Sequence, residues 1–275
     1  MISRLLVASD LSTRAARAVD RGLEIGGRFN AALKVLSVID EDLPLPIRDR
    51  RVAETDDVLH QTLKDRPAPP DVTIRVDTGT DHATIVEHAS AWPADMIMLG
   101  THRDRPVLDL FVGTTVERVL RRGDRPVLVV KNPTVGPYQR VLVAVDFSVY
   151  SRRALRFAVD LAPAAEVRAI HAYDLPFSGQ AGPIAAVERA QWLSTEILEQ
   201  LEALVTATVG PDRVECALRI GEVMPVITQE VAAWTPDLLV VGTHGRTGAP
   251  HALLGSVAER CLKDPQTDIL AVQAW

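Results

Sequence analysis

The stretch Gly242-Thr243-His244-Gly245, followed by nine residues and then Gly255-Ser256, decides the fold of this chain. It comes after the apolar run 238–241 and before a segment of helical periodicity, 257–263. A strand that ends in glycine and re-enters a helix at Gly-Ser gathers free backbone N–H groups, a hydroxyl and a helix N-terminus around one point. The stretch therefore predicts a strand–loop–helix unit that suits a phosphate chain.

Each residue of this loop also has a conformational explanation. Glycine at a strand end allows a turn with positive φ and lets an anion approach without a Cβ between them. Ser256 can cap the helix or donate a hydrogen bond to a phosphate oxygen. Because Gly and Ser dominate ordinary turns and caps, the single residues are weak signals, whereas the whole spacing is specific. We predict phosphate binding from the spacing.

Working outward, short β-branched runs alternate with segments of helical periodicity from the start of the chain. We predict strands at 5–8, 33–39, 72–76, 96–99 and 127–130, and helices at 12–28, 51–63, 83–91 and 114–121. Strands that alternate with helices favour a parallel sheet with helices on both faces.

The same order then begins again. Arg140-Val-Leu-Val-Ala-Val-Asp146-Phe-Ser148 restates Arg4-Leu-Leu-Val-Ala-Ser-Asp10-Leu-Ser12, and Gly242-Thr243-His244 restates Gly100-Thr101-His102. A longer helix at 183–209 accounts for the extra residues of the second copy. The chain is thus a tandem repeat of one domain, and we expect domains at 1–133 and 138–275 joined through the Pro- and Gly-containing linker 132–137.

Length and composition agree with two globular domains. The chain has 275 residues, of which 47% are hydrophobic, and its net charge of −6 disfavours a general nucleic-acid surface. No apolar run approaches the roughly 20 residues of a membrane span, and the first residues leave no room for a signal peptide. With Cys216 and Cys261 as its only cysteines, the protein is expected to be cytoplasmic, with both thiols buried and reduced.

Over essentially its whole length, the chain resembles the tandem two-domain form of the universal stress protein family. The motif that carries the resemblance is Gly-x-x-Gly, nine residues, then Gly-Ser or Gly-Thr, placed after a penultimate strand. The resemblance implies two Rossmann-like domains of the adenine nucleotide alpha hydrolase-like class, each with a five-stranded parallel sheet of order 3-2-1-4-5. The nucleotide would lie at the carboxyl ends of the strands, where the general rule for open α/β sheets also places a ligand.

The resemblance also implies which residues of the second half contact the nucleotide. Those expected around adenine and ribose are Ala144, Asp146 and Ala172, and those expected around the phosphates are Gly242, Gly245, Arg246, Gly255, Ser256 and Val257. The Asp146 carboxylate could accept from ribose hydroxyls or the adenine amino group. Alternatively, Asp146 or Ser148 caps the following helix, a role that is compatible with ligand contact.

The first half carries a degenerate version of the loop. Its counterpart residues are Asp10, Gly100, Arg103, Gly113 and Thr114. Arg103 replaces the second glycine, and its side chain occupies space where phosphate oxygens would approach. Asp104 and Asp109 stand at the positions of Arg246 and His251, and Pro106 replaces Gly248. Although an arginine can itself bind phosphate, this half is expected to bind nucleotide weakly or not at all.

Other chemistry finds little support. The sequence has no Gly-Lys-Ser/Thr phosphate loop and no Gly-x-Gly-x-x-Gly fingerprint. His244, His251 and Cys261 lack the spacing of a zinc site, and His102 and His171 are expected to make local hydrogen bonds. No nucleophile, base and orienting acid can be assembled from spacing, which favours a binding protein over an enzyme.

The leading hypothesis is a regulatory or stress-response protein that binds ATP, or AMP or ADP, with or without Mg²⁺. The alternatives are a slow ATP hydrolase or nucleotidyl transferase, and a protein that binds a partner with both sites empty. The last strand of each half is a predicted apolar edge. The resemblance implies that these two edges, 127–130 and 269–272, pair antiparallel within the chain, and it leaves open a homodimer and an unidentified protein partner.

Overall fold

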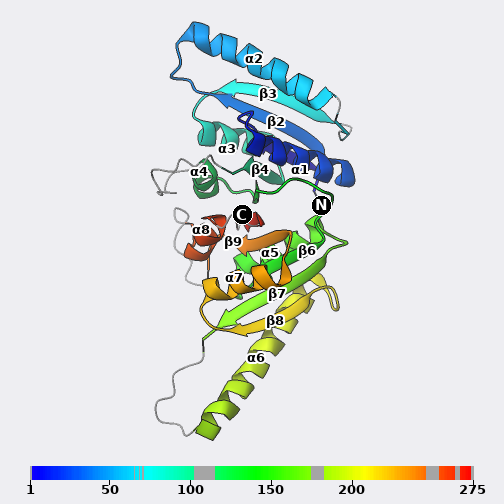
Figure 1. Cartoon of the computed structure of the whole chain (residues 1–275), viewed down its shortest axis with the longest axis vertical. Helices are drawn as coiled ribbons and strands as arrows, with labels where there is room; N and C mark the ends of the chain where they lie inside the picture. The colour runs from blue at the N-terminus through cyan, green and yellow to red at the C-terminus, as the bar shows by residue number, and fades with distance from the viewer. Residues whose placement is uncertain are drawn as a thin grey trace.

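The computed structural model describes residues 2–64, 66–67, 69, 71–101, 115–174, 183–245, 254–263 and 267–273, without the side chains of 183–188. Figure 1 shows strands stacked along the long axis of the molecule, with helices on both sides. Within the described ranges, no helix is both long and apolar enough to cross a membrane.

Strands and helices alternate throughout, as the sequence predicted. The first half contains β1 (Arg4–Ala8), α1 (Thr13–Phe29), β2 (Ala32–Ile39), α2 (Leu45–Lys64), β3 (Val72–Thr78), α3 (Asp81–Ala91), β4 (Met96–Gly100), α4 (Thr115–Arg122) and β5 (Val127–Val130). The second half contains β6 (Arg140–Ala144), α5 (Val149–Leu161), β7 (Glu166–Tyr173), α6 (Pro183–Val209), β8 (Glu215–Ile220), α7 (Val223–Trp234), β9 (Leu238–Gly242), α8 (Ser256–Lys263) and β10 (Asp268–Val272).

The first helix of each half begins where its capping serine predicts. The Ser12 hydroxyl accepts from the Ala15 N–H, and the Ser148 hydroxyl accepts from the Ser151 N–H, both at 3.1 Å. The second helix is longer than predicted, because α2 begins at Leu45 instead of near residue 51. Pro46 does not stop it, since a proline in the first turn removes an N–H that no helical carbonyl would have accepted.

The sheet has the order β3-β2-β1-β4-β5-β10-β9-β6-β7-β8. Each half therefore has the predicted order 3-2-1-4-5, and all neighbours within a half that pair are parallel. The two halves meet at β5 and β10, which pair antiparallel with Leu128 opposite Leu270. This confirms the predicted pairing within the chain and joins the two halves into one sheet of ten strands.

The core continues from one half into the other on both faces of the sheet. Successive side chains of a strand point to opposite faces. Leu128 and Leu270 belong to the apolar cluster under α1, α2, α5 and α6, whereas Val129 and Ile269 belong to the cluster under α3, α4, α7 and α8. Each fully buried side chain of this size contributes about 1.5–3 kcal/mol to stability, so the junction is a true core interface.

A buried polar cluster fastens the linker to this junction. The Asp268 carboxylate, whose side chain is 1% exposed, accepts from the Lys131 N–H at 2.8 Å and from the Tyr138 hydroxyl at 2.8 Å. The Arg21 guanidinium lies over the Tyr138 ring, 4.1 Å from its centroid. Burial, and then the adjacent Asp268 charge, raise the pKa of Tyr138 well above its usual value, so the hydroxyl remains a donor. The domain boundaries predicted on either side of this linker stay a prediction.

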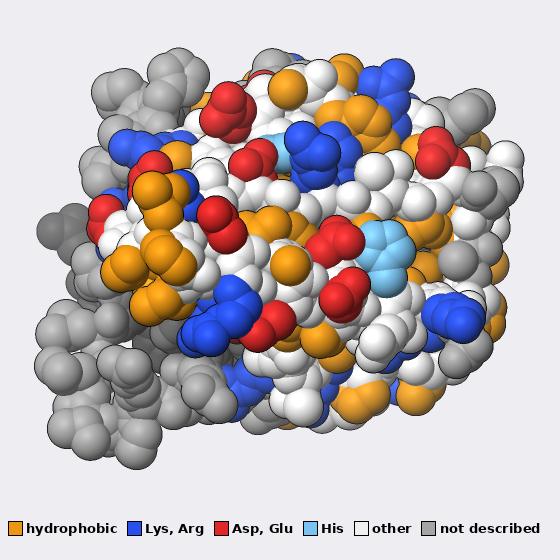
Figure 2. Space-filling view, turned by 90° about the horizontal axis from the view of Figure 1, so that it is seen from above, with side chains coloured by type: hydrophobic (Ala, Val, Ile, Leu, Met, Phe, Trp, Pro, Cys, Tyr) orange, Lys and Arg blue, Asp and Glu red, His pale blue; other side chains and the backbone are white. Residues whose placement is uncertain are grey.

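The end of the molecule that carries α2 has a mixed surface. Figure 2 shows acidic and basic side chains interspersed over this face, with apolar side chains between them. The exposed helix α2 itself carries charges of both signs and contains the i,i+4 ion pair of Arg50 with Glu54, 3.8 Å long. Exposed pairs of this kind add little stability.

Candidate functional site

A cavity of about 300 Å³ opens at the carboxyl ends of β6 and β9, the two strands between which the strand order of the second half reverses. The predicted residues that line it are Ala144, Asp146, Ala172, Gly242, Gly245, Gly255, Ser256 and Val257. Arg246, the remaining predicted residue of this half, lies outside the described residues. The fold thus brings together four separate segments of the sequence, 144–151, 170–172, 223–227 and 241–258.

One side of the cavity is apolar. Ile170 from β7, Val241 from β9, and Val226 and Ile227 from α7 form this wall. Ala172 at the end of β7 adds only a methyl group, which leaves room beside the wall. A flat aromatic ring is the ligand part that such a wall suits.

Asp146 turns the chain from β6 into α5. One carboxylate oxygen, Oδ1, accepts from the Ser148 N–H at 3.0 Å, and Phe147 between them has φ of 65°. The other oxygen, Oδ2, lies toward the loop, because a Cβ added to Gly245 would be 3.1 Å from it. Asp146 therefore fixes the turn and also lines the cavity. Ser148 caps α5 independently, which confirms the capping alternative, whereas the ligand contact of Asp146 stays a prediction.

The loop glycines differ from the expectation in one respect. We predicted positive φ at the strand end, but Gly242, Gly245 and Gly255 all lie outside the left-handed region. A Cβ on Gly242 would lie 2.8 Å from the Tyr150 Cβ, and one on Gly255 would lie 2.8 Å from the Thr243 carbonyl oxygen. Two of the three glycines are thus required by close contacts inside the protein.

Gly100 shows the same requirement in the first half. A Cβ there would lie 2.6 Å from the Arg14 carbonyl oxygen in the first turn of α1. Gly100 and Gly242 occupy equivalent strand ends, so glycine at this position indicates tight packing of a strand end on a helix. Gly245 differs, because among the described residues the atom that a Cβ there would approach within 4 Å is Oδ2 of Asp146. A glycine at position 245 is therefore the more specific indicator of a ligand.

Ser256 does not occupy the cap position of its helix. The Gly255 N–H donates to the Thr243 carbonyl at 2.7 Å, and the Gly255 carbonyl accepts from the Glu259 N–H at 2.9 Å. Gly255 therefore precedes the helix as its cap residue, and Ser256 is the first residue of α8, with an exposed side chain that lines the cavity. The capping role considered for Ser256 is wrong, and its hydroxyl lies beside the helix start.

Two histidines line the cavity. His171 Nδ1 lies 2.6 Å from the Val145 carbonyl oxygen, which confirms its predicted local hydrogen bond. His244, which sequence reasoning did not select as a ligand contact, has Nδ1 3.0 Å from the Thr243 hydroxyl and stacks at 5.0 Å on the Tyr150 ring. The signal in the sequence that could have selected His244 is its position directly before Gly245 in the motif. His102 lies outside the described residues, and no metal-binding group of side chains occurs in the ranges that the structure describes.

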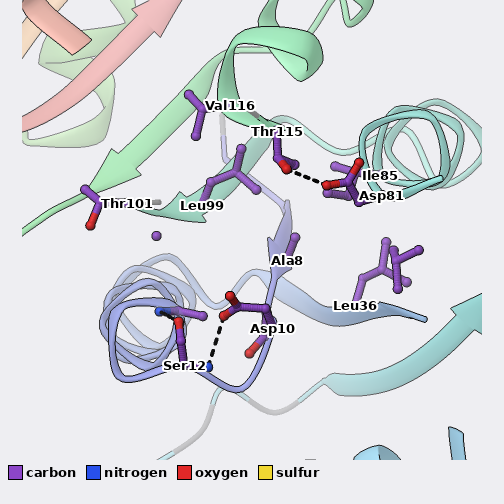
Figure 3. A pocket seen from close by; sticks show the side chains of 14 residues that line it. Ala8, Asp10, Ser12, Leu36, Asp81, Ile85, Leu99, Thr101, Thr115 and Val116 are labelled. Atoms are coloured by element: carbon purple, nitrogen blue, oxygen red, sulfur yellow. Dashed lines mark hydrogen bonds between the residues drawn. The ribbon is translucent and has the colours of Figure 1, made fainter. Parts of the chain in front are cut away.

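The first half has a corresponding cavity of about 230 Å³, shown in Figure 3. Asp10 and Gly100, two of the predicted counterpart residues, line it. Arg103, Gly113 and Thr114 lie outside the described residues, as do Asp104 and Asp109. The argument that the first loop is degenerate therefore stays a prediction.

The described walls nevertheless differ in charge between the two cavities. Asp81, the first residue of α3, stands where α7 begins with Val223. The Thr115 hydroxyl donates to the Asp81 carboxylate, and Figure 3 shows this pair on the opposite side of the cavity from Asp10. Burial alone would raise the pKa of Asp81, but the hydrogen bonds from Thr115 and His82 outweigh it and lower the pKa. Asp81 is therefore charged at neutral pH, and sequence reasoning missed it.

The two cavities also differ in the size of one lining side chain. Leu36 pairs with Ala8, and Ile170 pairs with Ala144, so Val38 in β2 is the counterpart of Ala172 in β7. Val38 lines the first cavity and adds two carbons at the point where the second cavity has only a methyl group.

Comparisons with known proteins agree with this architecture. The model of the universal stress protein family matches residues 1–131 and again 137–273. A universal stress protein of Methanocaldococcus jannaschii is 31% identical over 145 residues, which cover 50% of this chain and 82% of the relative. Universal stress protein A homolog 2 of Coxiella burnetii is 30% identical over 148 residues, covering 50% and 95% respectively.

A solved universal stress protein of Archaeoglobus fulgidus matches the whole fold. The alignment covers 98% of each chain with a TM-score of 0.69 at 17% identity. Two consecutive family matches, sequence relatives that each align with half of the chain's length, and a fold shared over both halves lead to one conclusion: the chain belongs to the universal stress protein family, in a tandem arrangement of two family domains.

Proposed function

We propose that this chain is a nucleotide-binding regulatory protein of the stress response, and that its second half holds ATP, or AMP or ADP. The observation that carries the proposal is the meeting of an apolar wall, the Asp146 carboxylate, Gly245 and the start of α8 around one cavity at the strand switch point. An adenine nucleotide has a flat apolar base, a sugar with two hydroxyls and an anionic chain, in that order. The three parts of the cavity match these three parts of the ligand.

In this arrangement, adenine lies against Ile170 and Ile227, and Ala172 leaves space for the ring. Asp146 Oδ2 accepts from ribose hydroxyls. The phosphates lie at the N-terminus of α8, where backbone N–H groups and the helix dipole favour negative charge. Gly245 allows their close approach, and Arg246 and Ser256 supply further donors.

The first half has a supporting role in this proposal. Its two cavity carboxylates, Asp10 and Asp81, disfavour a polyanion, so one nucleotide per chain is expected. Nucleotide binding would then bias the chain between conformations or partners. Mg²⁺ enters only as a counter-ion carried by the phosphates, whose oxygens it binds directly.

The decisive experiment is a calorimetric titration of ATP into the wild-type chain and two matched variants. Gly245→Arg places the side chain of position 103 in the second loop and should weaken ATP binding by at least about tenfold, which is 1.4 kcal/mol. Gly27→Arg adds the same side chain on an exposed turn of α1, where a Cβ would meet nothing within 4 Å, and should bind like wild type.

Three outcomes would count against the proposal: no ATP binding by the wild-type chain, equal affinity in both arginine variants, and metal-dependent product formation that Gly245→Arg abolishes. The last would favour the hydrolase or transferase alternative. Mass spectrometry of small molecules released from the purified protein would identify the nucleotide independently.

A further inference from the structure

The two ends of the molecule carry helices of different length. At one end lies α2, with 20 residues, and at the other end lies α6, with 27 residues. Figure 1 shows the N-terminal part of α6 running out beyond β8, the last strand of the sheet. The C-terminal part packs on the sheet, where Leu201 and Val205 are buried in the core. The helix is therefore anchored at one end and projects at the other.

Trp192 is the largest exposed apolar side chain on α6. The residue is 65% exposed, although tryptophan is highly buried on average. Nine residues at about 100° each place it on the opposite side of the helix from the buried Leu201. Tryptophan is also among the residues that contribute most to protein–protein interfaces. The position of Trp192 thus indicates a surface that another molecule covers.

Trp192 belongs to a stripe that runs along one side of α6, which we call the α6 stripe. Its members follow one another in steps that keep to one helix face, and they are Arg189, Trp192, Leu193, Glu196, Ala203 and Ala207. Leu193 and Glu196 are half-buried, and the others are exposed. The two exposed alanines allow a second helix to approach closely, because the distance between packed helices depends on the side chains at their contact.

The two charges of the α6 stripe make it complementary to itself. Arg189 and Glu196 lie about 10 Å apart along the helix axis, and among the described residues neither side chain forms a hydrogen bond or an ion pair. Consider a second copy turned antiparallel about a two-fold axis between positions 192 and 193. Arg189 then faces Glu196 of that copy, and Trp192 faces its Leu193. A two-fold interface contains each of these contacts twice.

We propose that the α6 stripe is a docking surface for a second copy of this chain, which binds as an antiparallel helix pair. Any partner protein could cover a tryptophan, but opposite charges at equal distances from the axis are what a two-fold pair requires. A helix pair is a small interface, so the dimer should dissociate at roughly micromolar concentrations. The inference is independent of the proposed function, because no member of the stripe lines either cavity.

Sedimentation equilibrium of the full chain between about 1 and 100 µM tests the surface. We expect Trp192→Asp to weaken self-association by about tenfold or more, as the loss of a central interface residue does. Val58→Asp is the matched control, since Val58 is an exposed apolar residue of α2 at the other end of the molecule. Its variant should associate like wild type. A monomeric wild-type chain over this whole range, or equal losses in the two variants, would overturn the proposal.

Charge reversal tests the antiparallel register. Arg189→Glu and Glu196→Arg should each weaken self-association by about fivefold or more, because each places like charges opposite one another at two points. When these two single variants are mixed, each glutamate faces an arginine, and the mixed dimer should form within about threefold of the wild-type affinity. A mixture that associates no better than its separate components would overturn this register.

The remaining outcomes are equally decisive. Thermal melting shows whether a variant that fails to associate is still folded, and the mixed charge variants decide the question if Trp192→Asp does not fold. Vesicles of anionic lipid, added to the wild-type chain, test a membrane as the occupant. Vesicle binding that Trp192→Asp abolishes, by a wild-type chain that remains monomeric, would overturn the second copy as the partner.

Discussion

The two halves of this chain place cavities at equivalent points of their sheets, but the walls of these cavities have different chemistry. In the second half, the described wall opposite Asp146 is apolar, and Val223 begins the neighbouring helix. In the first half, the equivalent helix begins with the charged Asp81, which faces a second carboxylate, Asp10, across the cavity. The comparison teaches that the fold supplies a cavity in either copy, whereas a few side chains set the charge of its wall, and we expect this charge to decide whether an anion is accepted.

The largest expected difference between the halves is in occupancy. Because two carboxylates line the first cavity and an intact glycine loop adjoins the second, calorimetry with ATP should give one site per chain. Two sites of similar affinity would break the comparison, since the acidic wall would then have no effect on a polyanion.

A smaller but more specific effect is expected when the acidic wall is transferred. Val223→Asp gives the second cavity the residue that the first cavity has at the equivalent position. This variant should weaken ATP binding on the order of tenfold. The reason is that two unit charges roughly 8 Å apart, at an effective dielectric constant of about 20 to 40, repel by about 1 to 2 kcal/mol. The measurement is calorimetry at low and high salt.

Val149→Asp is the matched control for this transfer. Val149 is also an exposed valine that begins a helix of the second half, at α5, but it does not line the cavity. Its variant should bind ATP like wild type. Similar losses in the two variants would mean that overall charge matters and the wall does not.

The smallest effect concerns the charge of Asp81 itself. Since its pKa in the folded protein is lowered, the charged carboxylate stabilises the fold above the pKa of the unfolded chain, and this contribution is lost as the pH falls through the folded pKa. Asp81→Asn should therefore lose less stability than wild type between about pH 5 and pH 3. The difference should stay below about 1 kcal/mol, because the side chain is 49% exposed and solvent screens it.

Urea unfolding at both pH values measures this difference. Asp57→Asn, at an exposed position on α2, is the control and should follow the wild-type curve. If Asp81→Asn also follows that curve, Asp81 gains nothing from its hydrogen bonds, and the contrast between the cavities would rest on geometry alone.

Much of the fold was predictable because the signals are local. Ser12 and Ser148 start helices where their capping role requires, and the repeated Asp10 and Asp146 segments reveal two copies of one domain. The start of α2 was missed because Pro46 at a helix N-terminus is indistinguishable, from composition alone, from a proline in a loop.

The site was only partly predictable, because its missing parts arise from contacts between distant segments. Gly242 is a glycine because the backbone of α5 lies close to its Cα. Asp81 joins the first cavity because α3 packs against β2 and α4. The sequence on either side of Gly242 and Asp81 gives no sign of these distant contacts. His244 lay inside the motif, but its contact with the Tyr150 ring becomes visible only in the folded chain.

The junction of β5 with β10 has an evolutionary consequence. A homodimer built on such an antiparallel strand pair would be symmetric, so every substitution would appear in both sites at once. Here both strands belong to one polypeptide, so their pairing does not depend on protein concentration. A substitution in one half also leaves the sequence of the other half unchanged. Tyr138 and Asp268 at the junction, and Asp81 and Val223 at the cavities, occur on one side only. A tandem chain thus allows the side chains of one cavity to change while those of its counterpart are kept.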